Sequence, residues 1–306
     1  MSWQPIVVGV DTSPEAAGAA AVACRLGAAA GTSCHLVHAA SDVWGSLQPD
    51  EGGQELQRAL IDAARIRIAA VLKDLVPREV VGGLSIRMGR TPTVLRQAVT
   101  ELGAELVVLG GKHHSALGRW LGGSTSLSVV RTTHVPLLVT VGSPLTLRRV
   151  LVAVDGSGAA PPTLQAAEHV ASALGAELRA LSVIEPLPVI PEVTPPYDSA
   201  AYYSLAEEQL QRDVWSRIRT PDVERIVRYG QPVELILREA TEWRADLLVV
   251  GSHGRGWAER VLVGSVTEQL LNHLPTSVLV VPTAIAVAEA EEPGRADAAR
   301  PLVAIA

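Results

Sequence analysis

A glycine-rich segment that follows the apolar run 246–250 has residue types suited to phosphate binding. Gly251-Ser252-His253-Gly254 ends this strand-like run, and nine residues later Gly264-Ser265 begins the helical pattern of residues 266–274. The first N–H groups of a helix lack partners within the helix, and the helix dipole favours negative charge there. Glycine lets the main chain approach a phosphate closely or adopt a positive φ angle. The segment therefore predicts a site for nucleotide phosphates.

The same arrangement occurs twice in the chain, at an interval of about 141 residues. The matching segments are 6–13 with 150–157, 104–110 with 245–251, Gly123-Ser124 with Gly264-Ser265, and 135–141 with 276–282. Because the matches keep their order, a whole domain is duplicated. We expect domains at residues 1–143 and 144–283, with the boundary at the turn-rich Gly142-Ser143-Pro144, and a mobile or partly helical tail at 284–306.

In each copy, short β-branched runs alternate with alanine- and leucine-rich stretches of helical pattern. The expected strands are 5–10, 34–39, 80–88, 105–110 and 136–141 in the first copy, and 149–154, 177–184, 223–229, 246–251 and 277–281 in the second. Apolar strands that alternate with helices indicate a parallel sheet covered by helices on both faces. The fold class is therefore α/β, with two tandem doubly wound, Rossmann-like domains of five parallel strands each.

The ligand edge of such a sheet lies beyond the carboxyl ends of the strands, where the strand order reverses. Asp11 and Asp155 end the first strands of the two copies, and Gly110 and Gly251 end the fourth strands. All four residues are therefore expected at the ligand edge. Capping of the following helix is an alternative role for the two aspartates. The polar or proline-rich segments 42–53 and 185–199 follow the second strands and are expected to cover the site.

Three other kinds of site are excluded by their motifs. A dinucleotide-binding domain needs G-x-G-x-x-G after its first strand, where this chain has Asp11-Thr12-Ser13-Pro14 and Asp155-Gly156-Ser157-Gly158. A Walker P-loop needs serine or threonine after its lysine, but His113 follows Gly111-Lys112. An esterase needs its serine within G-x-S-x-G, which neither Ser13 nor Ser157 has.

The composition narrows the class of partner. A net charge of −6 argues against a general nucleic-acid or membrane-surface binder, which is usually basic. No apolar run approaches the roughly 20 residues that span a bilayer, and the N-terminus has no signal-peptide pattern. Cys24 and Cys34 are too few for a cysteine metal site. We expect a cytoplasmic protein without a dedicated metal site.

The spacing G-x2-G-x9-G-S, together with the aspartate that closes the first strand, resembles the universal stress protein family in its tandem two-domain form. The resemblance covers residues 4–283, and the motif is complete in the second copy. In the first copy His113 stands where the second glycine is expected. The resemblance implies binding of ATP or a related adenine nucleotide. A Mg²⁺ ion that bridges the phosphates is a further expectation, without a carboxylate cluster of its own in the sequence.

In the second copy the resemblance implies a complete set of contacts to the nucleotide. The residues implied near the adenosine are Asp155, Val183, Gly251 and His253. Those implied to hold the phosphates and begin the helix are Gly254, Gly264, Ser265, Val266 and Thr267. The matching positions in the first copy are Asp11, Ala39, Gly110, Gly123 and Ser124. The imidazole of His113 either blocks this loop or, when protonated, contacts a phosphate.

The function expected from this resemblance is a regulatory or sensing role in the stress response, with no catalytic residues and at most weak ATP hydrolysis. A ligand-free dimerising scaffold is one alternative, and an ATP-using enzyme is another. The final strand of each copy is apolar and would lie at a sheet edge, which invites pairing. We therefore expect the two copies to form an internal pseudo-dimer and the chain to form a homodimer.

Overall fold

The computed structural model describes residues 3–41, 50–111, 125–142, 147–187, 198–254 and 263–282. The strands of the first copy are β1 (Ile6–Gly9), β2 (Cys34–Ala40), β3 (Ser85–Met88), β4 (Leu106–Gly111) and β5 (Leu137–Val141). Its helices are α1 (Pro14–Ala30), α2 (Glu51–Leu72), α3 (Arg78–Gly82), α4 (Thr91–Leu102) and α5 (Thr125–Val130).

The second copy repeats this order of elements. Its strands are β6 (Arg149–Ala153), β7 (Glu177–Ile184), β8 (Glu224–Tyr229), β9 (Leu247–Gly251) and β10 (Ser277–Val281). Its helices are α6 (Ala160–Leu174), α7 (Ser199–Asp213), the 3-10 turn η1 (Trp215–Arg217), α8 (Pro232–Glu242) and α9 (Ser265–His273).

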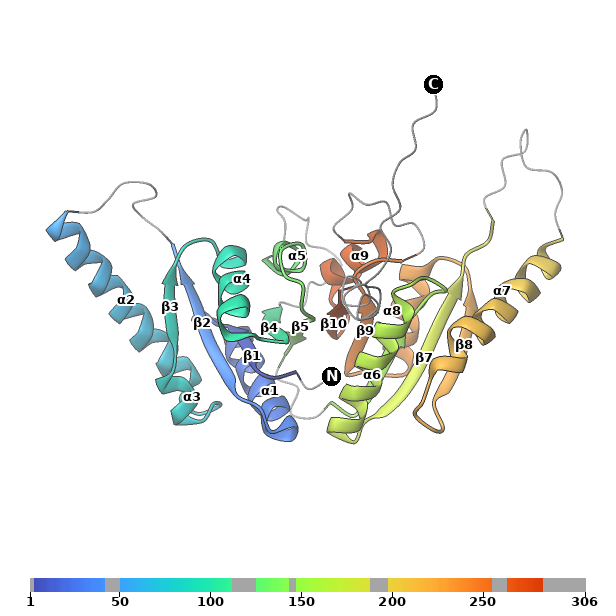
Figure 1. Ribbon diagram of the computed structural model, residues 1–306, viewed down its shortest axis with the longest axis horizontal. Helices are drawn as coiled ribbons and strands as arrows, with labels where there is room; N and C mark the ends of the chain where they lie inside the picture. The colour runs from blue at the N-terminus through green and yellow to red at the C-terminus, as the bar shows by residue number, and fades with distance from the viewer. Residues whose placement is uncertain are drawn as a thin grey trace, which may run out of the picture.

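All ten of these strands belong to one sheet, in the order β3-β2-β1-β4-β5-β10-β9-β6-β7-β8 (Figure 1). Within each copy the five strands are parallel, and the order reverses between the first and fourth strands, β1 and β4 or β6 and β9. The α/β class and the doubly wound arrangement are confirmed. The carboxyl ends of β6 and β9 meet at the reversal point of the second copy, where a ligand is expected.

The two copies meet through an antiparallel pair of strands, β5 and β10. Val139 lies opposite Val278 and Leu138 lies opposite Leu279 in this pair. Each strand therefore covers the apolar edge that the other would otherwise expose. Because these edges are used within one chain, a homodimer needs another surface, and the homodimer stays a prediction.

The sheet separates two hydrophobic cores, and each core extends through both copies. Ile6 and Val8 face the core under α1, α2, α6 and α7, whereas Val7 faces the core under α4, α5, α8 and α9. This alternation follows from the two-residue period of a strand. The helices cover both faces of the sheet but not the ends of its strands. A site is therefore expected at the carboxyl ends of the strands.

Local sequence signals set several helix ends. Ser13 begins α1 by accepting a hydrogen bond from the Ala16 N–H at 3.2 Å, and Asp50 begins α2 by accepting one from the Gly53 N–H at 2.8 Å. Gly31, Gly103 and Gly175 end their helices in the left-handed conformation, which glycine adopts without a steric penalty.

Nine of the ten predicted strands match the observed bounds to within one residue at each end, and 177–184 and 277–281 match them fully. The third strand is the exception. The strand predicted over residues 80–88 begins only at Ser85, because Arg78–Gly82 form the short helix α3 after Pro77. The β-branched pair Val80-Val81 suggested a strand, yet both residues pack against the core from a helical turn. Two segments predicted as loops, 42–53 and 185–199, include the first residues of helices, since α2 begins at Glu51 and α7 at Ser199. Residues 42–49, 188–197 and the predicted tail lie outside the described residues.

None of the helices in the described ranges combines the length and the apolar character needed to cross a membrane.

Candidate functional site

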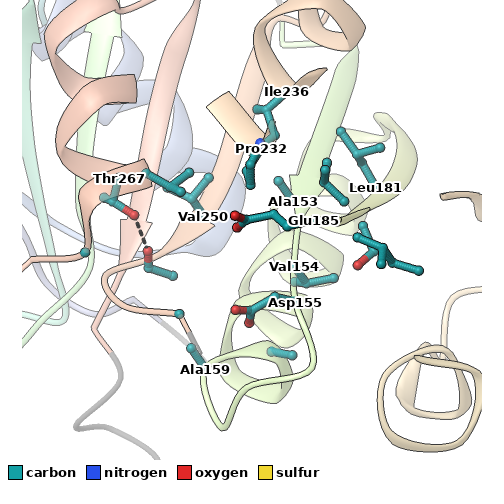
Figure 2. A pocket seen from close by; sticks show the side chains of 18 of the residues that line it. Ala153, Val154, Asp155, Ala159, Leu181, Glu185, Pro232, Ile236, Val250 and Thr267 are labelled. Atoms are coloured by element: carbon teal, nitrogen blue, oxygen red, sulfur yellow. Dashed lines mark hydrogen bonds between the residues drawn. The ribbon is translucent and has the colours of Figure 1, made fainter. Parts of the chain in front are cut away.

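A cavity of about 700 Å³ opens at the carboxyl ends of β6, β7 and β9 (Figure 2). All nine residues predicted for the second copy line it, and they are Asp155, Val183, Gly251, His253, Gly254, Gly264, Ser265, Val266 and Thr267. These residues come from three strand ends and the start of α9. The fold thus brings together the whole set that the sequence singled out in this copy.

Helix α9 presents its N-terminus to the cavity. Gly264 is the residue before the first turn, and no side chain in the described part of the chain caps the helix there. The hydroxyl of Thr267, in contrast, donates a hydrogen bond to the Gly251 carbonyl at 2.7 Å and ties the first turn to the end of β9. Ser265 lies exposed at the cavity wall. The first N–H groups of α9 are therefore positioned to bind an anion.

Gly254 lies against the carboxylate of Asp155. A Cβ atom built on Gly254 would be 2.8 Å from Asp155 Oδ2, so a side chain here would displace that carboxylate. None of Gly251, Gly254 and Gly264 has a positive φ angle. The need for glycine at position 254 is therefore one of space beside Asp155, not of backbone conformation.

Asp155 and Asp11 do not cap the helices that follow them. Asp155 Oδ1 accepts a hydrogen bond from the Ser157 N–H at 3.1 Å, and Asp11 Oδ1 accepts one from the Ser13 N–H at 2.8 Å. Each aspartate therefore stabilises the turn after its strand. Ser13 is the residue that caps α1, so the alternative of direct capping is wrong.

The adenosine side of the predicted site contains residues that the sequence analysis did not identify. Leu181, Glu185, Tyr202, Pro232 and Ile236 also line the cavity. Pro232 and Ile236 belong to the first turns of α8, directly after β8. Their position after a strand end was a usable signal, but nothing in their residue types indicated chemistry.

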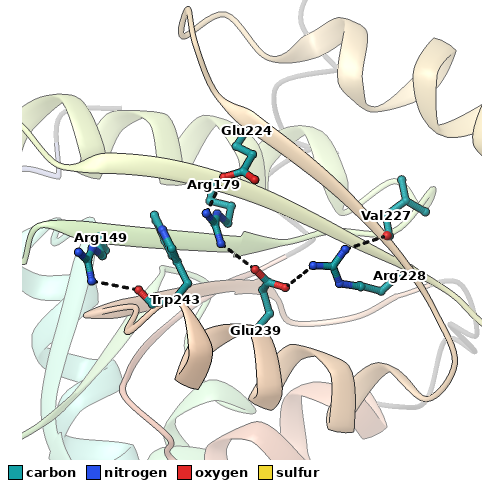
Figure 3. Close-up of polar contacts among 7 residues, drawn as sticks. All are labelled: Arg149, Arg179, Glu224, Val227, Arg228, Glu239 and Trp243. Atoms are coloured by element: carbon teal, nitrogen blue, oxygen red, sulfur yellow. Dashed lines mark hydrogen bonds and ion pairs between the residues drawn. The ribbon is translucent and has the colours of Figure 1, made fainter.

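An ion-pair network holds α8 against the sheet (Figure 3). Glu239 of α8 is 6% exposed and pairs with Arg179 of β7 at 2.8 Å and with Arg228 of β8 at 3.0 Å. Arg179 also pairs with Glu224 at 2.5 Å and stacks on Trp243 at 4.4 Å from the ring centroid. The network anchors the helix whose first turns form one wall of the cavity.

In the first copy the structure describes Asp11, Ala39 and Gly110, whereas Gly123, Ser124 and His113 lie outside the described residues. Gly110 packs tightly on the first turn of α1, since a Cβ atom built on it would be 2.4 Å from the Glu15 carbonyl carbon. At the matching position Gly251, the nearest atom is the Ala159 Cβ, at 3.0 Å. The helix that follows the first strand thus approaches the fourth strand more closely in the first copy than in the second.

The cavity combines an apolar wall with the N-terminus of α9. Among the residues that the structure describes, no group of three or more histidine, cysteine, aspartate or glutamate side chains could hold a metal. An apolar wall beside a helix N-terminus suits a ligand that is apolar at one end and anionic at the other. A magnesium ion would therefore have to arrive with the phosphates and take them as ligands.

The sequence pattern of the universal stress protein family matches residues 2–140 and again residues 146–282. A universal stress protein of Mycolicibacterium smegmatis is 31% identical over 291 residues, which cover 90% of this chain and 96% of that protein. A universal stress protein of Mycobacterium tuberculosis is 31% identical over 296 residues, with the same shares of the two chains. These relatives match the full tandem arrangement and not one copy alone.

Solved structures show the same fold. A universal stress protein from Archaeoglobus fulgidus superposes with a TM-score of 0.62 at 18% identity, covering 92% of this chain and 100% of that one. A universal stress protein from Pseudomonas aeruginosa superposes with a TM-score of 0.60 at 19% identity, covering 94% and 95%. With both copies matched and the tandem relatives aligned along nearly their whole length, the chain belongs to the universal stress protein family.

Proposed function

We propose that the chain binds ATP, or a closely related adenine nucleotide, in the cavity of its second copy. The observation that carries this proposal is the convergence of nine predicted residues on one cavity that ends at the N-terminus of α9. Phosphates would bind the main-chain N–H groups beside Gly254 and those of Ser265 and Val266 in the first turn of α9, whereas the Gly264 N–H already donates to the Ser252 carbonyl at 2.8 Å. The base would bind against the apolar wall formed by Val183, Pro232 and Ile236.

The role that we propose for this binding is regulatory. Family membership supports a part in the stress response, and bound nucleotide would set the conformation that partners recognise. Among the described lining residues, none is a lysine or arginine that would stabilise charge on a transferring phosphoryl group. We therefore expect slow hydrolysis at most. A cytoplasmic location is part of the same proposal, because cytoplasm supplies ATP to the site.

The test is the substitution Gly254→His, which places in the second copy the residue that the first copy has at position 113. The imidazole would collide with Asp155 and fill the phosphate end of the cavity. We expect wild-type protein to bind ATP in isothermal titration calorimetry and to release nucleotide on denaturing extraction, as detected by mass spectrometry. The variant should bind at least about tenfold more weakly, the loss of about 1.4 kcal/mol of binding free energy.

The matched control is Gly82→His, because Gly82 is exposed and a Cβ atom on it meets no atom within 4 Å. This control adds the same imidazole far from the cavity and should bind ATP like wild type. Equal affinity of wild type and Gly254→His would overturn the assignment of the phosphate loop. Absence of heat and of any thermal shift when ATP is added to wild type would overturn the proposed function.

A further inference from the structure

Glu185, which the sequence analysis did not identify as a site residue, lies at the end of β7 and lines the cavity. Figure 2 shows its carboxylate directed into the same space as that of Asp155. Its side chain is exposed, and no described residue donates a hydrogen bond to its carboxylate. An ionised carboxylate only accepts hydrogen bonds, so Glu185 offers the ligand a pure acceptor.

The order of the strands indicates which part of a nucleotide meets Glu185. Strands β9, β6 and β7 are neighbours, and their ends carry Gly251, Asp155 and Glu185 in that order. Adjacent strands lie about 4.8 Å apart, so the ends of β9 and β7 are separated by about 10 Å. A nucleotide with its phosphates at the loop after β9 would place its ribose over β6 and its base over β7.

The surroundings of Glu185 favour a base over further phosphates. Leu181, Pro232 and Ile236 form the apolar wall on this side of the cavity, and the two carboxylates among the described lining residues are Asp155 and Glu185. A phosphate beside Glu185 would be repelled by it, whereas the faces of a purine ring would pack against the apolar wall. The outer edge of adenine carries one strong donor group, the exocyclic amine, which a carboxylate can accept.

We infer that Glu185 is a specificity-determining residue that accepts a hydrogen bond from the exocyclic amino group of the bound adenine. The inference rests on the proposed function, because it requires a nucleotide in this cavity. The backbone of Glu185 is held in place from α7, since the Tyr202 hydroxyl donates a hydrogen bond to the Glu185 carbonyl at 2.9 Å. The carboxylate therefore projects from a fixed point of the β7 end.

The experiment is a thermodynamic cycle with two ligands, ATP and purine riboside 5′-triphosphate, which has hydrogen in place of the amino group. Each ligand is titrated by calorimetry into the full-length wild type, Glu185→Ala and Glu185→Gln. Removal of Glu185 also relieves its repulsion of the phosphates, but this effect is the same for both ligands. The ratio of the two affinities therefore isolates the contact with the amine.

We expect wild type to bind ATP about tenfold or more tightly than the analogue, as is typical of a hydrogen bond to a charged group. In Glu185→Ala this ratio should fall to within about twofold of unity. Glu185→Gln keeps an acceptor oxygen and should retain part of the preference. The control Glu242→Ala removes an exposed carboxylate from the last turn of α8, outside the cavity lining, and should keep the wild-type ratio.

The outcomes separate the two claims. Wild type that binds both ligands equally, or Glu185→Ala that keeps the full preference for ATP, would overturn the role of Glu185 and leave the nucleotide site intact. Wild type that binds neither ligand would overturn the proposed function, and the role of Glu185 with it.

Discussion

At the scale of single residues, two hydroxyl groups in the first turn of α9 have different tasks. Thr267 is buried and uses its hydroxyl within the protein, where it bonds to the Gly251 carbonyl. Ser265 is exposed at the cavity wall. The family resemblance implied both residues for the site. In the fold, the Thr267 hydroxyl is used in a hydrogen bond within the protein, whereas Ser265 lies exposed at the cavity wall.

These different tasks predict that one conservative substitution affects ATP binding and the other affects stability. Ser265→Ala should weaken ATP binding about tenfold, since hydrogen bonds to charged groups are among the stronger ones, and should change unfolding free energy by less than about 0.5 kcal/mol. Thr267→Val should lower the unfolding free energy by about 1 kcal/mol, because it leaves the Gly251 carbonyl without this partner. Calorimetry with ATP and urea denaturation of the ligand-free protein measure the two effects. A large loss of stability in Ser265→Ala would contradict this assignment.

At the scale of elements, α8 contributes both to the cavity wall and to the ion pairs with β7 and β8. Its first turns supply Pro232 and Ile236 to the cavity wall, and Glu239 near its other end forms the ion pairs with β7 and β8. Arg179 is 17% exposed and its guanidinium is held by Glu239, Glu224 and the ring of Trp243. A charge at this depth is stable only while its partners remain.

Glu239→Ala should therefore destabilise the protein by about 3 kcal/mol, because it leaves Arg179 with part of its charge uncompensated. Arg228→Ala removes the more exposed partner, which is 43% exposed, and should cost less than about 1 kcal/mol. Urea denaturation of both variants beside wild type measures the difference. Equal losses of stability would show that burial does not decide the strength of these pairs.

At the scale of the whole molecule, the two copies contact each other both within the sheet and in the core on one of its faces. Besides the antiparallel β5–β10 pair, Trp3 of the first copy packs edge-on against His169 of α6, with ring centroids 4.9 Å apart. The Nε2 atom of His169 is buried and has no hydrogen-bond partner among the described residues. Burial lowers the pKa of His169 below its ordinary value of 6.5, because the protonated ring is poorly solvated there.

The sign of this pKa shift predicts how stability responds to acid. Below pH 6.5 the unfolded chain binds a proton at His169 more readily than the folded chain, so this residue reduces stability as the pH falls, and its effect is absent well above pH 6.5. His169→Phe keeps an aromatic ring for Trp3 and cannot titrate. As the pH is lowered from 7.5 to 5.5, the unfolding free energy of this variant should rise relative to that of wild type, as measured by urea denaturation. A difference that is independent of pH would rule out a lowered pKa.

The parts of the fold that depend on neighbouring residues in the chain were predictable. Nine of the ten predicted strands match the observed ones closely, because continuous apolar runs bounded by turn residues define buried parallel strands. The prediction of the third strand was wrong at its start, because Val80 and Val81 suit a strand by propensity but lie in α3. The predicted nucleotide ligand, its companion Mg²⁺ and the homodimer stay predictions.

By itself, the sequence determined the duplication, the α/β class and the glycine loop with Asp155, since each depends on periodicity or on short fixed spacing. Only the tertiary structure decided that β5 pairs with β10, that α8 supplies a cavity wall and that Glu185 lines the same cavity as Asp155. These contacts join segments far apart in the chain, and their residue types carry no motif. The physical reason is that spacing constrains what lies within one turn or strand, whereas packing of distant elements depends on the shape and volume of every side chain between them.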